Sequence, residues 1–343
     1  LHKICRYIYQ MMDVKGHVPY YGDDDDGRTF ILDDGQGHPN SYASILTAGA
    51  ILFKDPVLKS KAAGMDTRNM ILFGEAGKAA YDALPTEKQA PQTVLYKEEG
   101  HFFCKSGSGD KEVYLHVDAA PLGYLSIAAH GHADALSFFL WVDGAPIFAD
   151  MGTYTYHSEP EWRDYFKGTL AHNTIRVDGV DQARAEGPCL WLDHYEVEVL
   201  EAHQDPAQDR ITARHNGYAE KGVMHTRSYH FDKVAGRITI KDTLDITDGA
   251  THRFDVPLHL HPNVTIEEGA GGTFVLRNGE ARAVGLKPDP QLSYSLVNGQ
   301  QEPLLGWHSP SFLQRETTNV LFASLERAES FELITEITIE PAS

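Results

Sequence analysis

The pattern of hydrophobic and polar positions divides the chain into a helical beginning and a long strand-rich remainder. Apolar residues recur at helical spacing in three segments, 2–12, 41–53 and 69–84. Asn40 or Ser41 can cap the second segment, which the following Asp-Pro pair ends. We therefore predict helices over residues 1 to about 90, with a linker near 85–91.

From residue 93 onward, short segments of alternating apolar and polar residues replace the helical spacing, for example at 113–117 and 237–242. Turn pairs such as Asp178-Gly179 and Asn298-Gly299 recur between these segments. Many short strands with frequent turns are typical of an antiparallel sandwich. The predicted fold is mainly β, with an α-helical N-terminal segment over 1–90 and a large antiparallel β-sandwich over 91–343.

One predicted hairpin gathers residues that are suited to bind a metal ion. Residues 137–149 have the pattern of two strands joined by a tight turn at Asp143-Gly144. His132 precedes the first strand, Asp150 follows the second, and His172 opens a later strand that runs to residue 177. Folding therefore places two imidazoles and a carboxylate at one rim of a sheet, and these groups are ligands that zinc prefers.

His130 lies one glycine before the first of these candidate ligands. Gly131, between the two histidines, is expected to take backbone angles that other residues avoid. His130 is therefore available for chemistry while its neighbour His132 binds metal.

Composition and charge exclude several classes of function. Acidic residues outnumber basic ones 49 to 30, and the formal charge of −19 argues against binding to nucleic acid. No run of eighteen apolar residues exists, so we expect no membrane span. The three cysteines have no C-x-x-C spacing, which argues against a cysteine metal site. The acidic run at 23–26 lacks the spacing of an EF-hand and is interpreted as a solvated turn, with Arg28 pairing locally.

Three stretches resemble the heparinase II/III-like polysaccharide lyases: HGHADALS at 130–137, FADMGTYTY at 148–156 and AHNT at 171–174. The resemblance is specific over 130–182 and looser over most of the chain. Upstream, YGDDDDGR at 21–28 is similar to a G-D-x-D-x-G-R stretch near the end of that family's helical domain. In such lyases an (α/α) toroid packs against an antiparallel β-sandwich, with the active cleft between them. The resemblance implies that residues 1–90 are the last toroid helices and that 91–343 are the sandwich domain.

The resemblance also assigns roles. His132, Asp150 and His172 match the family's zinc ligands, and the Zn²⁺ they hold is expected to be structural. His130 matches the cleft histidine. Tyr156 is the nearest match to a cleft tyrosine, with Tyr154 as a competing candidate. The family's remaining catalytic groups, an Asn or His and a Tyr, lie earlier in the toroid, so the chain is expected to be a C-terminal piece of a longer enzyme.

The implied activity is β-elimination on a uronic-acid-containing glycan of the heparin or heparan sulfate kind. Removing the C5 proton builds negative charge beside a carboxylate, which His130 would neutralise while a tyrosine moves the proton. Arg163 and Asn173 are expected to bind this anionic polysaccharide or oligosaccharide, Arg163 as part of a local basic cleft. No nucleic acid or membrane partner is expected, and a homodimer is a possible assembly. The implied location is the bacterial periplasm, with the cytoplasm as the alternative.

Two alternatives stay open at this point. His132, Asp134 and His172 also have the ligand types of an Fe(II) oxygenase, in which the first two ligands are often spaced H-x-D. The other alternative is a non-catalytic carbohydrate-binding fragment. Zinc content would favour the lyase, and redox-active iron would favour the oxygenase.

Overall fold

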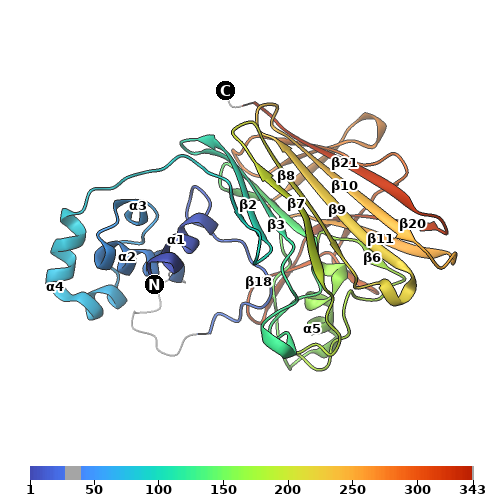
Figure 1. The fold of residues 1–343 in the computed structure, drawn as a ribbon, viewed down its shortest axis with the longest axis horizontal. Helices are drawn as coiled ribbons and strands as arrows, with labels where there is room; N and C mark the ends of the chain where they lie inside the picture. The colour runs from blue at the N-terminus through green and yellow to red at the C-terminus, as the bar shows by residue number, and fades with distance from the viewer. Residues whose placement is uncertain (28–39, 342–343) are drawn as a thin grey trace.

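The N-terminal part of the chain is helical, as predicted. The computed structural model describes residues 1–27 and 40–341, and Figure 1 shows the helices grouped beside the β-structure. Asn40 caps the second helix, since its Oδ1 accepts from Ala43 N at 3.0 Å, and Asp66 caps the last, which begins at Thr67. The helices are α1 (His2–Met11), α2 (Ser41–Phe53), α3 (Pro56–Lys59) and α4 (Thr67–Ala83).

Antiparallel strands make up most of the rest, which confirms the predicted mainly β fold. The first sheet contains β1 (Val94–Tyr96), β2 (His101–Ser108), β3 (Lys111–Asp118), β4 (Phe138–Val142) and β5 (Ala145–Phe148), in that order. The second has the order β15 (Ser295–Asn298), β20 (Asn319–Arg327), β11 (His252–His259) and β6 (Arg176–Val177). The third and largest has the order β12 (Thr265–Glu268), β13 (Phe274–Arg277), β14 (Val284–Lys287), β21 (Phe331–Ile339), β10 (Arg237–Ile246), β9 (Val223–Asp232), β8 (Gln208–His215) and β7 (Val197–Gln204).

Shorter elements lie in the connections between these strands. Two small hairpins pair β16 (Gln300–Gln301) with β17 (Leu304–Leu305) and β18 (Trp307–Ser311) with β19 (Gln314–Thr317). The connection between β5 and β6 contains α5 (Pro160–Lys167) and the 3-10 turn η2 (Thr169–Ala171).

The sheets form two layers around one core (Figure 1). A bridge between Phe148 and Leu260 joins the first sheet to the end of β11 in the second. Side chains from this combined layer, such as Phe138 and Leu321, pack with Ile240 of the eight-stranded sheet in a single buried cluster. Alternating strand residues therefore bury one face of each sheet, as the sequence pattern predicted.

The hairpin that precedes Asp150 has the predicted form, but the strand after His172 is shorter than predicted. Asp143 and Gly144 have φ angles of 54° and 70°, which a two-residue hairpin turn requires. The predicted strand over 173–177 is wrong except at Arg176–Val177. The backbone N–H of His259, which ends β11, donates to the side chain of Asn173 at 2.7 Å instead of to a strand carbonyl. This side-chain contact replaces the ladder where the prediction expected one.

The end of α1 is fixed to the first sheet. Lys105 Nζ donates to Gln10 O at 2.7 Å, and Tyr114 Oη donates to Met11 O at 2.8 Å. These donors satisfy carbonyls that are unpaired at a helix C-terminus. The segment after α1 is thereby placed against the sandwich. Within the described residues, no helix is long and apolar enough to span a membrane.

Candidate active site

Two histidines and an aspartate meet in a buried cluster at the rim of the sandwich. His132 lies between β3 and β4, Asp150 follows β5, and His172 follows η2. One ligand atom from each lies within 4.8 Å of the others. His132 Nδ1 is 3.2 Å from His172 Nε2, and His172 Nε2 is 3.3 Å from Asp150 Oδ2. The structure thus brings together the three residues that the sequence proposed as metal ligands, called here the ligand trio.

Hydrogen bonds on the outer side of the ligand trio decide which of its atoms carry lone pairs. His172 Nδ1 faces the carbonyl of Gly168 at 2.8 Å, so Nδ1 carries the hydrogen and Nε2 is an acceptor. His132 Nε2 faces Asp23 Oδ1 at 2.9 Å, so His132 Nδ1 is likewise an acceptor. Asp150 Oδ2 is buried and has no hydrogen-bond partner among the described residues. Three acceptors therefore face one another, and this arrangement needs a cation or a proton between them.

The pKa values show how the ligand trio behaves without a metal. Burial would raise the pKa of Asp150, but its contact with His172 and the charge of both histidines hold that pKa below its usual value. Burial would lower the pKa of His172, but Asp150 and Asp134 outweigh burial and raise it to about 9. A proton on His172 therefore satisfies the cluster in the metal-free protein, and a metal ion would have to displace it.

Two of the three separations within the ligand trio fit a tetrahedral ion, and the third, between His132 and Asp150, is within 4.8 Å. Zinc binds nitrogen and carboxylate oxygen at about 2.0–2.1 Å, which places two ligands of a tetrahedral ion about 3.3 Å apart. The observed separations are 3.2 and 3.3 Å. Asp134, the carboxylate of the oxygenase alternative, is not in the cluster that the described residues form. Burial and the nearby Asp118 also raise the pKa of Asp134 well above its usual range. Both the geometry and this pKa therefore favour the set that contains Asp150 over the set that contains Asp134.

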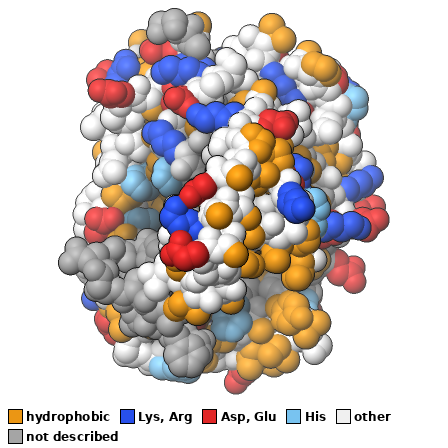
Figure 2. Space-filling view, turned by 90° about the vertical axis from the view of Figure 1, so that its left-hand side faces the viewer, with side chains coloured by type: hydrophobic (Ala, Val, Ile, Leu, Met, Phe, Trp, Pro, Cys, Tyr) orange, Lys and Arg blue, Asp and Glu red, His pale blue; other side chains and the backbone are white. Residues whose placement is uncertain are grey.

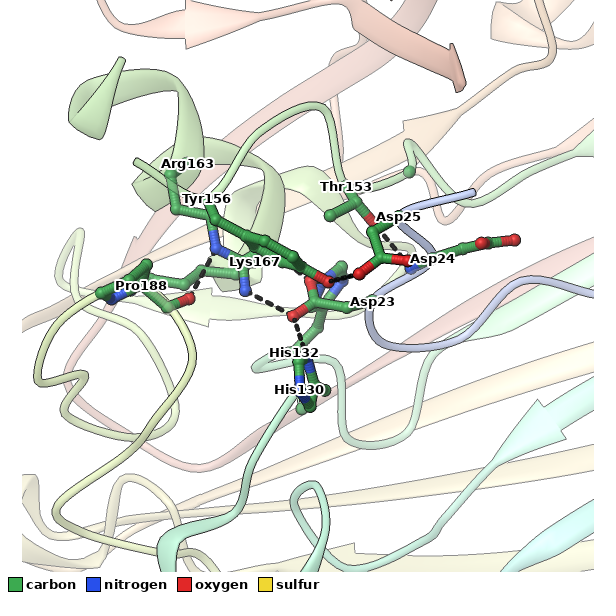
Figure 3. A network of polar contacts seen from close by, with 12 residues as sticks. Asp23, Asp24, Asp25, His130, His132, Thr153, Tyr156, Arg163, Lys167 and Pro188 are labelled. Atoms are coloured by element: carbon green, nitrogen blue, oxygen red, sulfur yellow. Dashed lines mark hydrogen bonds and ion pairs between the residues drawn. The ribbon is translucent and has the colours of Figure 1, made fainter. Parts of the chain in front are cut away.

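Asp23 connects the ligand trio to His130, as Figure 3 shows. Its Oδ2 is 3.1 Å from His130 Nδ1, and Arg163 forms a bidentate ion pair with the same carboxylate. Cys189 groups with Asp23 and His130 as a second set of possible metal ligands. Because the Arg163 guanidinium already neutralises Asp23, that set is a poorer candidate for binding a cation than the ligand trio.

The acidic run at 23–26 is exposed at Asp24, Asp25 and Asp26, as predicted for a solvated turn, but the prediction is wrong for Asp23. The side chain of Asp23 is only 1% exposed. Asp25 Oδ2 accepts from Tyr156 Oη at 3.3 Å, and Asp26 Oδ2 accepts from Phe312 N at 2.9 Å. The run therefore faces the sandwich. The expected pairing with Arg28 lies outside the described residues.

His130 is held by its backbone in an unusual conformation. Its φ angle is 60°, in the left-handed region, while Gly131 has no positive φ angle. The prediction that Gly131 supplies the unusual angles is therefore wrong. A Cβ at Gly131 would lie 2.6 Å from Gly123 N, so this glycine is required for close backbone packing. Two backbone bonds, His130 N to Cys189 O at 3.2 Å and Asp23 N to His130 O at 3.0 Å, hold the strained residue in place.

The two candidate tyrosines occupy different environments. Tyr156 lies beside His130, with ring centroids 5.9 Å apart. The hydroxyl of Tyr154 instead contacts Glu159 and Arg315, and its ring packs in a buried aromatic cluster. Burial and the carboxylates of the acidic run raise the pKa of Tyr156, so its hydroxyl keeps its proton. Of the two candidates, Tyr156 is therefore the one that lies beside His130, and its hydroxyl is protonated.

Arg163 and Asn173 do not have the placement expected of residues that bind substrate directly. The Arg163 side chain is 2% exposed and is held by Asp23 and by the carbonyl of Pro188. Asn173 is also buried, and its Nδ2 donates to Phe138 O at 3.0 Å and Ala149 O at 3.3 Å. Both side chains are engaged by the protein itself, because charged and polar groups in the interior need partners.

The face of the molecule on the helical side carries both signs of charge. Among the side chains drawn in colour, Figure 2 shows Lys and Arg mixed with acidic residues. Arg163 is buried against Asp23, so it does not form part of the local basic cleft that the sequence suggested.

The comparisons with known proteins agree with this fold. The family described as Heparinase II/III-like, C-terminal, matches residues 90–334. A heparin-sulfate lyase of Bacteroides stercoris is 27% identical over 109 residues, which are 31% of this chain and 16% of that protein. An exo-oligoalginate lyase of Saccharophagus degradans is 27% identical over 146 residues, which are 39% of this chain and 19% of that protein.

Solved structures show the same fold over nearly the whole chain. A heparinase III structure superposes with a TM-score of 0.72 at 17% identity, covering 99% of this chain and 46% of its own. The heparan sulfate lyase of Pedobacter heparinus gives a TM-score of 0.68 at 13% identity, covering 97% of this chain and 45% of its own. The chain thus spans less than half the length of these structures.

The fold and site define a two-layer antiparallel β-sandwich, preceded by helices, that carries a buried His-Asp-His cluster with a histidine beside it. The family match covers most of this sandwich. The chain belongs to the heparinase II/III-like family, of which it contains the C-terminal domain.

Sequence reasoning missed Asp23 as a member of the site. The stretch at 21–28 was matched to the family, but the charges around Asp23 suggested exposure. The G-D-x-D-x-G-R spacing of that stretch is the available signal in the sequence, and it does not identify a partner for the Asp23 carboxylate. The partners, His130, His132 and Arg163, lie more than one hundred residues away along the chain.

Proposed function

We propose that this chain is the C-terminal part of a polysaccharide lyase that cleaves a uronic-acid-containing glycan by β-elimination, with a structural zinc ion in the ligand trio. The observation that carries the proposal is the buried convergence of three acceptor atoms directly beside His130. Two curated relatives are named as lyases of heparin-sulfate and oligoalginate. Both polymers contain uronic acids, which supports this substrate class.

In the proposed reaction a base takes the proton from C5 of the uronate. The electron pair of that C–H bond forms the C4–C5 double bond, the C4–O bond breaks, and the departing oxygen takes a proton from an acid. Charge builds on the neighbouring carboxylate during this step, and a positioned donor must stabilise it.

The residues of this chain suit parts of that reaction. His130 directs Nδ1 to Asp23, so Nε2 is the atom left to meet substrate, and its side chain is 56% exposed. Nε2 would donate to the uronate carboxylate when the ring carries two protons. Tyr156 keeps its hydroxyl proton and would deliver it to the departing oxygen. The zinc ion would hold the segments of the ligand trio together, with no step assigned to it.

The test measures the ultraviolet absorbance of the unsaturated uronate product with heparan sulfate, hyaluronate, chondroitin and alginate. The protein used in this assay is the chain together with any protein sequence that precedes it. His130→Ala should abolish elimination while leaving the zinc content at one ion per chain. Full activity of His130→Ala would overturn the assigned role. Glycan binding without unsaturated product from any polymer would favour a carbohydrate-binding module instead.

A further inference from the structure

The Asp23 carboxylate accepts from four nitrogen atoms of three side chains. Its Oδ1 accepts from His132 Nε2 at 2.9 Å and from Arg163 Nη1, and its Oδ2 accepts from His130 Nδ1 at 3.1 Å and from Arg163 Nη2 at 2.8 Å. Each oxygen thus takes one imidazole and one guanidinium nitrogen. Figure 3 shows these groups converging on the carboxylate from separate segments.

The carboxylate is held by segments on both sides of it. Asp24 N donates to Thr153 Oγ1 at 2.8 Å, next to the Asp150 loop. Gly22 has a φ angle of 68°, and a Cβ there would lie 2.7 Å from His130 O, so only glycine allows this approach. The segment after α1 is therefore fixed against two of the loops that form the site, and Asp23 has little freedom to move.

We propose that Asp23 is a positioning residue that couples metal binding at the ligand trio to the orientation of His130. The inference rests on the proposed function. When His132 Nδ1 binds the metal, Nε2 must carry a hydrogen and donate it to Asp23 Oδ1. The planar fork of Arg163 fixes the plane of the carboxylate, so Oδ2 is left in one position to receive His130 Nδ1–H. His130 Nε2 is then directed outward to substrate.

A purely structural ion pair would not require this arrangement. Arg163 alone would satisfy both oxygens of Asp23, as bidentate pairs do elsewhere. The two imidazoles are additional partners, and they belong to the metal ligand and to the cleft histidine. Because His132 and His130 both donate to the Asp23 carboxylate, their orientations are linked. An ion pair between Asp23 and Arg163 alone would leave the orientation of His130 independent of the metal.

Asp23→Asn tests the link, because it keeps the shape but replaces one acceptor oxygen by an amide that repels a neighbouring donor. Asp24→Asn is the matched control, since it removes the same charge from the adjacent residue, whose side chain accepts, among the described residues, from Asp26 N at 3.1 Å. For Asp23→Asn we expect zinc affinity and kcat to fall about 10- to 100-fold each, with KM changed less than about threefold. Asp24→Asn should leave all of these values unchanged.

Imidazole ¹⁵N NMR provides a measurement that does not depend on catalysis or on the variant folding. Removing zinc from the unmodified chain with a chelator should shift or broaden the signals of both His132 and His130, and adding zinc should restore them. A change at His132 with no change at His130 would overturn the coupling, as would normal kcat and normal His130 signals in folded Asp23→Asn. If no glycan is cleaved at all, the proposed function fails while the NMR result still decides the coupling.

Discussion

A substitution of Asn173 can distinguish two roles: the sequence suggested that it binds substrate, whereas the structure shows its side chain buried and hydrogen-bonded to the backbone. Its Nδ2 donates to Phe138 O and Ala149 O, and its Oδ1 accepts from His259 N. Ala149 immediately precedes Asp150, and Asn173 immediately follows His172. The side chain therefore ties together the backbone that carries two members of the ligand trio. Asn173→Ala should damage stability and metal binding together.

The size of the effect follows from the three buried hydrogen bonds. Each buried group left without a partner costs about 1–3 kcal/mol, and the values do not add fully. We expect Asn173→Ala to lower the free energy of unfolding by about 3–5 kcal/mol. Loosening both ligand segments should also weaken zinc binding by about 10- to 100-fold, as loss of supporting contacts does in other metal sites.

Chemical denaturation and zinc competition with a chromophoric chelator measure these two quantities. Asn298→Ala is the matched control, because it removes an exposed amide with one side-chain hydrogen bond, to Asn319. It should change neither quantity by more than about 0.5 kcal/mol. A stable Asn173→Ala protein with normal zinc affinity and a raised KM would refute this reasoning and restore the role in substrate binding.

Further predictions follow from the same contacts. Alanine at any member of the ligand trio should remove zinc and lower the melting temperature, whereas His130→Ala should keep zinc, as atomic absorption and thermal denaturation would show. Tyr156→Phe should lower kcat at least about 10-fold at unchanged stability, whereas Tyr154→Phe should lower stability by about 1–2 kcal/mol at unchanged kcat. Burial lowers the pKa of His259 to about 3, so the folded state resists protonation. Stability should therefore fall as pH drops below about 6.5, by about 2 kcal/mol between pH 7 and 5, and denaturation of His259→Gln should show a smaller slope with pH.

The sequence predicted elements that depend on local pattern. The hairpin at Asp143-Gly144 and the cap at Asn40 formed as expected, because turn and capping residues act through their own neighbours. The sequence also predicted that the ligand trio converges, since the hairpin brings Asp150 back towards the start of the strand that follows His132. In each case a short stretch of chain contains the information.

Contacts between segments far apart in the sequence explain why the expected roles of Asn173 and Arg163 were wrong. Asn173 follows a strand-opening histidine, and nothing nearby shows that its amide serves Ala149 and His259. Arg163 is basic and polar in sequence, but its partner Asp23 is 140 residues away. A buried polar group is recognisable only when its partners are known, and these partners are supplied by the tertiary fold.

The position of Asp23 explains why the helical segment and the sandwich form one site. The sandwich provides Arg163, His130 and His132, three groups that need an anion when they are brought together. The segment after α1 provides that anion, and α1 itself is fixed to the sandwich through Lys105. Without Asp23, the buried guanidinium of Arg163 would lose its carboxylate partner and the tautomer of His132 would no longer be fixed. The ligand trio and His130 are therefore linked by a residue from outside the sandwich.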